Sequence, residues 1–210
     1  MDRRKFFKIG SVATVGTGLL YPLNGIAQPL DIPTYSNKTP KNIIMMVSDG
    51  MSSGTLSMTD IFLNRKYGKP SNWMSLYHEN KVSRALMDMA SASSIVTDSA
   101  AASSSWGGGH RVANGSLNIG KNGEEHSPIW LKFKNVGKKT GCVTTVAITH
   151  ATPAGFMANS KKRNAQEDIA QQYLERGYDV LMGGGDNYFN PEKRTDKQDL
   201  YTKFKNKGYQ

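Results

Sequence analysis

Cysteine is almost absent from this chain, since Cys142 is the only one among 210 residues. A single cysteine excludes an intrachain disulfide, and its place in the apolar segment 140–148 predicts a buried, unreactive thiol. The apolar stretch 9–20 is interrupted by glycines and is shorter than the ~20 residues of a membrane-spanning helix, so we expect no stable membrane anchor. Acidic residues are also few, with 17 against 27 basic ones and a net charge of +10. The basic residues are scattered without interleaved aromatics, which argues against a nucleic-acid partner.

The N-terminal residues indicate where the protein goes. Arg3 and Arg4 are adjacent and are followed by an aromatic pair and the apolar stretch, which is typical of a twin-arginine export signal. Small residues at Gly25 and Ala27 predict cleavage after Ala27, so residues 1–27 form the signal, although a surface amphipathic helix is the alternative. The proline-containing segment 28–40 is then a linker. We therefore expect a periplasmic or secreted protein.

Residues 41–210 alternate between strand and helix patterns and predict one α/β domain with a mostly parallel central sheet and helices on both faces. The expected strands cover 42–47, 143–148 and 178–182. The expected helices cover 53–64, a segment that begins at Ser99, 129–136 and 165–176, and a long glycine-rich loop is expected at 106–123. Functional residues should gather at the carboxyl ends of the strands.

Segment 97–104 places an acid and a hydroxyl in front of a run of small residues. Small side chains allow the chain to enter a helix directly after Asp98, and they allow an anion to approach the helix N-terminus, where unpaired N–H groups favour negative charge. A serine hydroxyl needs a base, a helix dipole or a metal to become a good nucleophile. Ser99 is therefore the candidate nucleophile.

Oxygen-bearing side chains follow two of the expected strands. Asp49 comes after the strand at 42–47, and His150 and Thr152 come after the strand at 143–148. Mg²⁺ prefers oxygen ligands, so a carboxylate at Asp49 and a hydroxyl at Thr152 are suitable partners for it. The alternatives are a cap or turn role for Thr152 and a hydrogen-bonded loop role for His150.

Four blocks of sequence, taken in order together with Arg163, resemble the alkaline phosphatase family. The blocks are residues 48–51 (SDGM), 97–101 (TDSAA), 149–154 (THATPA) and 179–185 (DVLMGGG). One block alone would be weak, because an Asp-Gly pair is usually just a turn. Four blocks in the family's order, joined by plausible helices, argue against chance agreement, and the resemblance covers roughly residues 40–210.

The resemblance implies a phosphomonoester hydrolase that acts on phosphate monoesters through a phosphoserine at Ser99, with two Zn²⁺ and one Mg²⁺ as cofactors. The family residue that matches Asp49 bridges a zinc site and the magnesium site, and the matching serine binds one zinc. The residue that matches Thr152 is a magnesium ligand, and the one that matches His150 tunes the third metal site.

Arg163 matches the arginine with which the family holds phosphate. A guanidinium offers a rigid fork of donors that fits two phosphoryl oxygens. The adjacent Lys161 and Lys162 leave a solvated basic turn as the alternative. The glycines at 183–185 lack the Gly-Lys-Ser/Thr ending of a phosphate-binding P-loop, so we expect a structural turn there.

Members of the resembled family are longer, and their further residues complete the metal sites. No histidine follows His150 in this sequence. The resemblance therefore implies an alkaline-phosphatase-like fold that is incomplete at its C-terminus and nearly inactive as this chain alone. A phosphodiesterase or sulfatase of the same superfamily and a noncatalytic fragment are the alternative functions, and a homodimer is left open.

Overall fold

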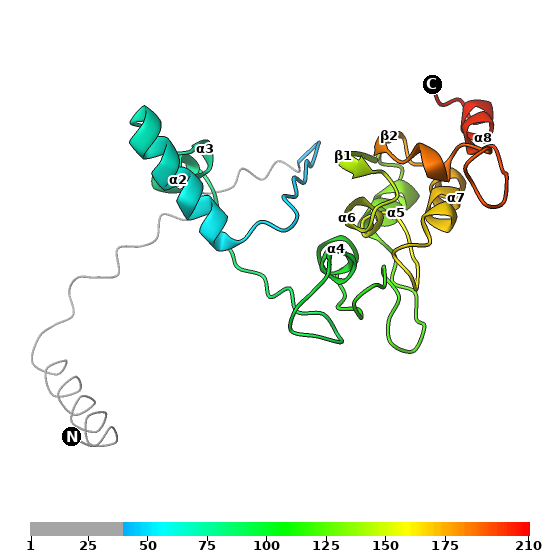
Figure 1. Ribbon diagram of the computed structural model, residues 1–210, viewed down its shortest axis with the longest axis horizontal. Helices are drawn as coiled ribbons and strands as arrows, with labels where there is room; N and C mark the ends of the chain where they lie inside the picture. The colour runs from blue at the N-terminus through cyan, green and yellow to red at the C-terminus, as the bar shows by residue number, and fades with distance from the viewer. Residues whose placement is uncertain (1–39) are drawn as a thin grey trace, which may run out of the picture. The chain divides into compact units, whose positions relative to one another are not determined.

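The computed structural model describes residues 40–210 (Figure 1). The predicted signal at 1–27 and all but the last residue of the predicted linker at 28–40 lie outside the described residues. The helices and strands are α2 (Ser53–Tyr67), α3 (Asn72–His78), α4 (Ser99–Gly108), α5 (Ile129–Asn135), β1 (Gly141–Ala147), α6 (Ala151–Ala154), α7 (Gln166–Arg176), β2 (Val180–Gly184), the 3₁₀ helix η1 (Asp186–Tyr188) and α8 (Leu200–Asn206).

The two strands form a parallel pair, as expected for an α/β domain (Figure 1). Cys142 lies opposite Leu181 and both pack against the core, whereas Val143 and its partner Met182 are 73% and 59% exposed on the sheet. Burial raises the pKa of the Cys142 thiol to about 11, so this thiol stays protonated at neutral pH. The predicted strands at 143–148 and 178–182 are therefore present, each shifted by one or two residues.

The predicted strand at 42–47 is wrong for this structure. These residues have no strand conformation, and Ile44 and Met46 are 86% and 91% exposed. A buried strand is held by ladder hydrogen bonds to a neighbour, and within residues 40–210 β1 and β2 pair with each other alone. The apolar residues 42–47 have the composition of a buried strand, but a strand forms only next to a neighbouring strand, which this local sequence does not provide.

The crossover between β1 and β2 contains α7, which supplies much of the core. Ile169 and Ala170 on one turn and Tyr173 and Leu174 on the next are buried, which is the spacing of an amphipathic helix. Gly177 ends the helix with a left-handed φ of 66°, which a residue with a side chain rarely adopts. The predicted helix at 165–176 is confirmed to within one residue.

Helix α4 continues further than the sequence predicts. The expected loop at 106–123 begins only at Gly109, because Trp106, Gly107 and Gly108 belong to the last turn of α4. A Cβ atom on Gly107 would lie 2.5 Å from the carbonyl oxygen of Gly155, beside α6. Gly107 and Gly108 are thus helical residues, and Gly107 allows a close approach of backbone.

Candidate active site

Ser99 is the first residue of α4, as the sequence predicts. Asp98 caps the helix, and its carboxylate accepts a hydrogen bond of 2.9 Å from the N–H of Ala101. Ser99 is partly exposed, whereas residues 100–105 behind it are buried. The hydroxyl therefore stands at the accessible, positively polarised end of a helix whose remaining turns are anchored in the core.

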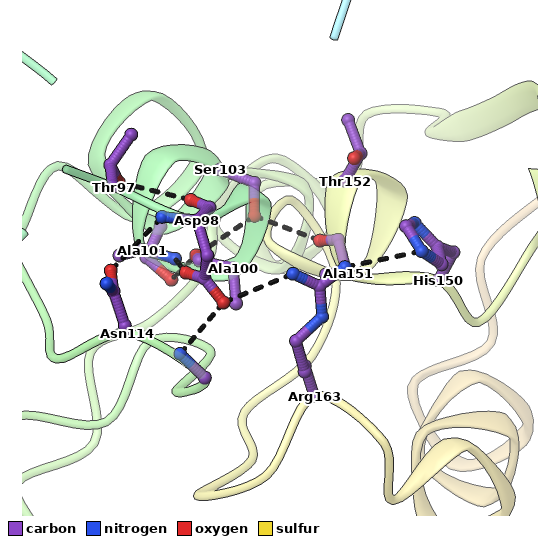
Figure 2. A network of polar contacts seen from close by, with 12 residues as sticks. Thr97, Asp98, Ala100, Ala101, Ser103, Asn114, His150, Ala151, Thr152 and Arg163 are labelled. Carbon is purple, nitrogen blue, oxygen red and sulfur yellow. Dashed lines mark hydrogen bonds and ion pairs between the residues drawn. The ribbon is translucent and has the colours of Figure 1, made fainter. Parts of the chain in front are cut away.

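Asp98 also organises the surroundings of this helix start (Figure 2). Its second carboxylate oxygen accepts hydrogen bonds from the N–H of Gly115 at 2.9 Å and from Arg163 Nη1 at 3.1 Å. Its own N–H donates to Asn114 Oδ1 at 3.1 Å. Sequence reasoning gave Asp98 no role of its own, although an aspartate directly before a run of small residues is a helix-cap signal that could have identified it.

The Arg163 side chain is held in place and is not a freely solvated turn residue. Its ion pair with Asp98 leaves about a quarter of each side chain exposed, at 25% for Arg163 and 26% for Asp98. Its other terminal nitrogen, Nη2, lies 3.3 Å from His150 Nε2 (Figure 2). The guanidinium therefore connects the start of α4 with the residue that precedes α6.

Asp49 reaches the same region from a distant part of the sequence. Its carboxylate accepts a hydrogen bond of 2.6 Å from the hydroxyl of Thr152. This hydrogen bond, with a smaller contribution from the Ser99 hydroxyl, lowers the pKa of Asp49 below its usual value and outweighs the opposing effect of burial. The Asp49 carboxylate is therefore ionised at neutral pH and lies beside two hydroxyl oxygens.

His150 immediately precedes α6 and has one nitrogen without a partner. Its Nδ1 atom is buried and makes no hydrogen bond, while Nε2 faces Arg163. A metal ion or a water molecule would satisfy this orphaned atom. Carboxylate and hydroxyl oxygens at Asp49 and Thr152 suit magnesium, so the residues present fit part of a metal site. Within residues 40–210, however, no three His, Cys, Asp or Glu side chains form a metal-binding group.

The structure thus brings Asp49, Thr152, His150 and Arg163 to the N-terminal end of the helix that carries Ser99. The sequence profile of the alkaline phosphatase family matches residues 40–210. The chain belongs to the alkaline phosphatase family.

Relatives and solved structures in this family agree with the assignment. The chain is 30% identical to alkaline phosphatase 4 of Bacillus subtilis over 80% of this chain and 37% of that protein. It is 35% identical to the alkaline phosphatase of Schizosaccharomyces pombe over 79% of this chain and 32% of that protein. The crystal structure of Thermus thermophilus alkaline phosphatase superposes with a TM-score of 0.70 and 38% identity, over 77% of this chain and 34% of that one.

The chain therefore spans about a third of the length of these alkaline phosphatases. The alkaline phosphatase of a Shewanella species superposes with a TM-score of 0.67 and 29% identity, over 78% of this chain and 39% of that one.

Within residues 40–210, none of the helices has the length and apolar composition needed to cross a bilayer.

A structural turn is expected at the glycines 183–185, but Gly183 and Gly184 belong to β2 and the turn begins at Gly185. A Cβ atom on Gly183 would lie 2.7 Å from the Thr144 side chain of the neighbouring strand, and Gly185 has a φ of 110°. Close packing between β1 and β2 and a turn into η1 therefore account for Gly183 and Gly185.

Proposed function

We propose that this chain carries the nucleophile-bearing part of a phosphomonoester hydrolase in which Ser99 becomes phosphorylated. The observation that best supports the proposal is the convergence at the start of α4. The Ser99 hydroxyl, the Arg163 guanidinium held by Asp98 and the Asp49–Thr152 pair all lie at one helix N-terminus. Transfer of a phosphoryl group requires an attacking oxygen, hydrogen-bond donors for the phosphoryl oxygens and ligands that hold a cation nearby.

In the proposed reaction, Ser99 Oγ attacks the phosphorus of the monoester and the bond from phosphorus to the ester oxygen breaks. The leaving oxygen takes up a proton in place of the one that the Ser99 hydroxyl gives up, the alcohol departs, and Ser99 carries the phosphoryl group. Water then attacks the phosphoserine, which releases inorganic phosphate and restores the hydroxyl. Arg163 would hold two phosphoryl oxygens through its fork of donors, with Asp98 keeping the guanidinium oriented.

The metals implied by the family are also proposals for this chain. Two Zn²⁺ and one Mg²⁺, when bound, would supply positive charge that favours the ionised form of the Ser99 hydroxyl and offsets the negative charge of the phosphoryl oxygens. Asp49 and Thr152 offer oxygen ligands, and the unpartnered Nδ1 of His150 offers a nitrogen. A mutant of the alkaline phosphatase from the Antarctic bacterium TAB5, with a TM-score of 0.60 to this chain, was solved with Mg bound in its M3 site.

We further propose that the 210-residue chain by itself is nearly inactive. Zinc takes three or four protein ligands, and residues 40–210 do not bring such a set together. Without a metal, the Ser99 hydroxyl stays protonated near neutral pH. The chain incubated with zinc and magnesium should hydrolyse a monoester no faster than its Ser99→Ala variant, and turnover well above that control would contradict this proposal.

A chimeric enzyme tests the function directly. Residues 40–210 would replace the matching third of Thermus thermophilus alkaline phosphatase, which supplies the rest of the fold. We expect hydrolysis of 4-nitrophenyl phosphate and a phosphoserine detectable by mass spectrometry, both lost in Ser99→Ala and retained in Ser105→Ala, a buried serine of the same helix. A folded chimera that retained its phosphoenzyme in Ser99→Ala would overturn the assignment of the nucleophile.

Substrate choice separates the proposal from its alternatives. The same chimera would be assayed with bis(4-nitrophenyl) phosphate and 4-nitrophenyl sulfate. A phosphomonoester hydrolase should prefer the monoester, whereas a preference for the diester or the sulfate would assign the chain to another activity of the superfamily.

The route of export remains a proposal that rests on the sequence. We propose that Arg3 and Arg4 direct the protein through the twin-arginine pathway to the periplasm or beyond. A reporter protein fused after residue 40 should be exported with the native residues and retained in the cytoplasm when both arginines are changed to lysine. Equal export of the two fusions would refute this route.

A further inference from the structure

A tight junction between α4 and α6 lies directly behind the candidate site. Ser103 lies one helical turn after Ser99, is fully buried, and has its Oγ 2.9 Å from the carbonyl oxygen of Ala151 (Figure 2). Ala151 is the neighbour of Thr152 in α6. The same hydroxyl lies 3.1 Å from the carbonyl oxygen of Ala100 in its own helix, and its shorter contact, to Ala151, connects the helix that carries Ser99 with the helix that carries Thr152.

Close packing reinforces this hydrogen bond. A Cβ atom on Gly155 would lie 2.2 Å from Ser103 Oγ and 2.4 Å from Ser103 Cβ. A Cβ atom on Gly107 would lie 2.5 Å from the carbonyl oxygen of Gly155. These contacts involve backbone atoms, which cannot move aside as a flexible side chain can, so the two helices cannot approach each other more closely. The hydrogen bond opposes their separation. The distance between the two helices is thus restricted in both directions.

The geometry of the site depends on that distance. Asp49 accepts a hydrogen bond from Thr152 on α6 and lies near the Ser99 hydroxyl on α4. A single carboxylate can serve both hydroxyls only while the two helix starts remain close together. Displacements on the order of 1 Å are sufficient to impair a reaction that requires aligned groups.

We propose that Ser103 is a positioning residue, which sets the spacing of Ser99 and Thr152 through its hydrogen bond to Ala151 and its contact with Gly155. This inference rests on the proposed function for its catalytic consequence, but its geometric content is independent of activity. Ser103 would touch neither substrate nor metal and would act only through the relative position of α4 and α6.

The test compares Ser103→Ala with Ser105→Ala in the 210-residue chain. Ser105 is also buried in α4, and its hydroxyl donates to Ala101 in the same helix at 3.1 Å, so its removal deletes a comparable hydrogen bond without a partner in α6. We expect similar losses of thermal stability in the two variants. In NMR spectra, the backbone amide signals of Asp49 and Thr152 should shift in Ser103→Ala and stay in place in Ser105→Ala.

A second variant, Ser103→Cys, places a larger sulfur atom and a weaker donor in the closely packed junction with Gly155, and it should also shift the Asp49 and Thr152 signals. Unchanged Asp49 and Thr152 signals in both Ser103 variants, or equal shifts in Ser105→Ala, would overturn the inference.

The chimera supplies the functional measurement. Ser103→Ala should lower kcat by about tenfold while inhibition by inorganic phosphate stays the same, because Arg163 keeps its ion pair with Asp98. An active chimera whose kcat is unaffected by Ser103→Ala would refute the positioning role and leave the proposed function intact. An inactive native chimera would count against the proposed function, and the NMR comparison would still decide the geometry.

Discussion

Replacing Asp179 by Asn should destabilise the fold in a way that depends on pH. The Asp179 carboxylate accepts a hydrogen bond of 3.0 Å from the N–H of Thr140, which precedes β1. It also pairs with Lys139 at 3.0 Å and Lys134 at 3.2 Å. These interactions, the Thr140 hydrogen bond first among them, lower the pKa of Asp179 from 3.8 to about 2. Asn is isosteric and can still accept from Thr140, but it carries no charge.

The magnitude follows from the pKa difference between the folded and unfolded chain. A decrease of nearly two pKa units corresponds to at most about 2.5 kcal/mol of stability at neutral pH. The carboxylate is still 20% exposed and the Lys139 side chain is 89% exposed, so solvent screening reduces this value, and we expect a loss of about 1–2 kcal/mol. Because the folded pKa is the lower one, the contribution is complete well above pH 3.8 and is lost as the pH falls towards 2.

Urea unfolding of the native chain and Asp179→Asn measures this effect. The difference in unfolding free energy should be largest at pH 7, fall to about half at pH 3 and shrink with added salt. Lys193, which pairs with Asp186 on the surface, provides a matched control, since Lys193→Met should change stability little at any of these pH values. An Asp179→Asn difference that stayed constant from pH 7 to pH 3 would refute the electrostatic explanation.

Three further predictions follow from other contacts. Gly107→Ala should lower the unfolding free energy by about 1–3 kcal/mol, because the added Cβ would meet backbone atoms. Gly54→Ala in α2, where the nearest atom to the added Cβ is 3.5 Å away, should be neutral or stabilising, and equal effects of the two variants in chemical denaturation would disprove the packing argument. Arg194→Met should lower the unfolding free energy by about 3 kcal/mol, because Arg194 is 2% exposed, pairs with Asp196 and donates to the carbonyl oxygen of Tyr188. An unchanged Tm would show that these interactions contribute nothing to stability. In the chimera, Arg163→Lys should weaken phosphate inhibition and lower kcat/KM by about tenfold, equivalent to about 1.4 kcal/mol, with little change in Tm; an unaltered inhibition constant would remove Arg163 from phosphate binding.

Local signals were sufficient for much of the chain. The helix start at Ser99, the amphipathic α7 with Gly177 at its end, and the strands β1 and β2 all follow from spacing, caps and apolar runs that act within a few residues. The helices α3 and α8 were not predicted, although each has a cap signal, Ser71 before α3 and Asp199 before α8. Those signals were present and could have been used.

Contacts between distant residues were decided by the tertiary structure. The sequence marks Arg163 as a candidate phosphate-binding residue, but only folding brings it into an ion pair with Asp98, 65 positions away. The bond between Asp49 and Thr152 joins residues 103 positions apart. No local pattern encodes such pairs, because their formation depends on how whole elements pack.

What the sequence by itself determined is the family and much of the α/β alternation, since these depend on residue type and short-range order. The tertiary structure decided which apolar segments become strands and which glycines belong to helices. The segment 42–47 lacks a strand partner within residues 40–210 and stays exposed, while Gly107 lies in α4, where the backbone of Gly155 leaves no room for a side chain. Backbone pairing and close packing both require a second surface, and one stretch of sequence cannot specify that surface alone.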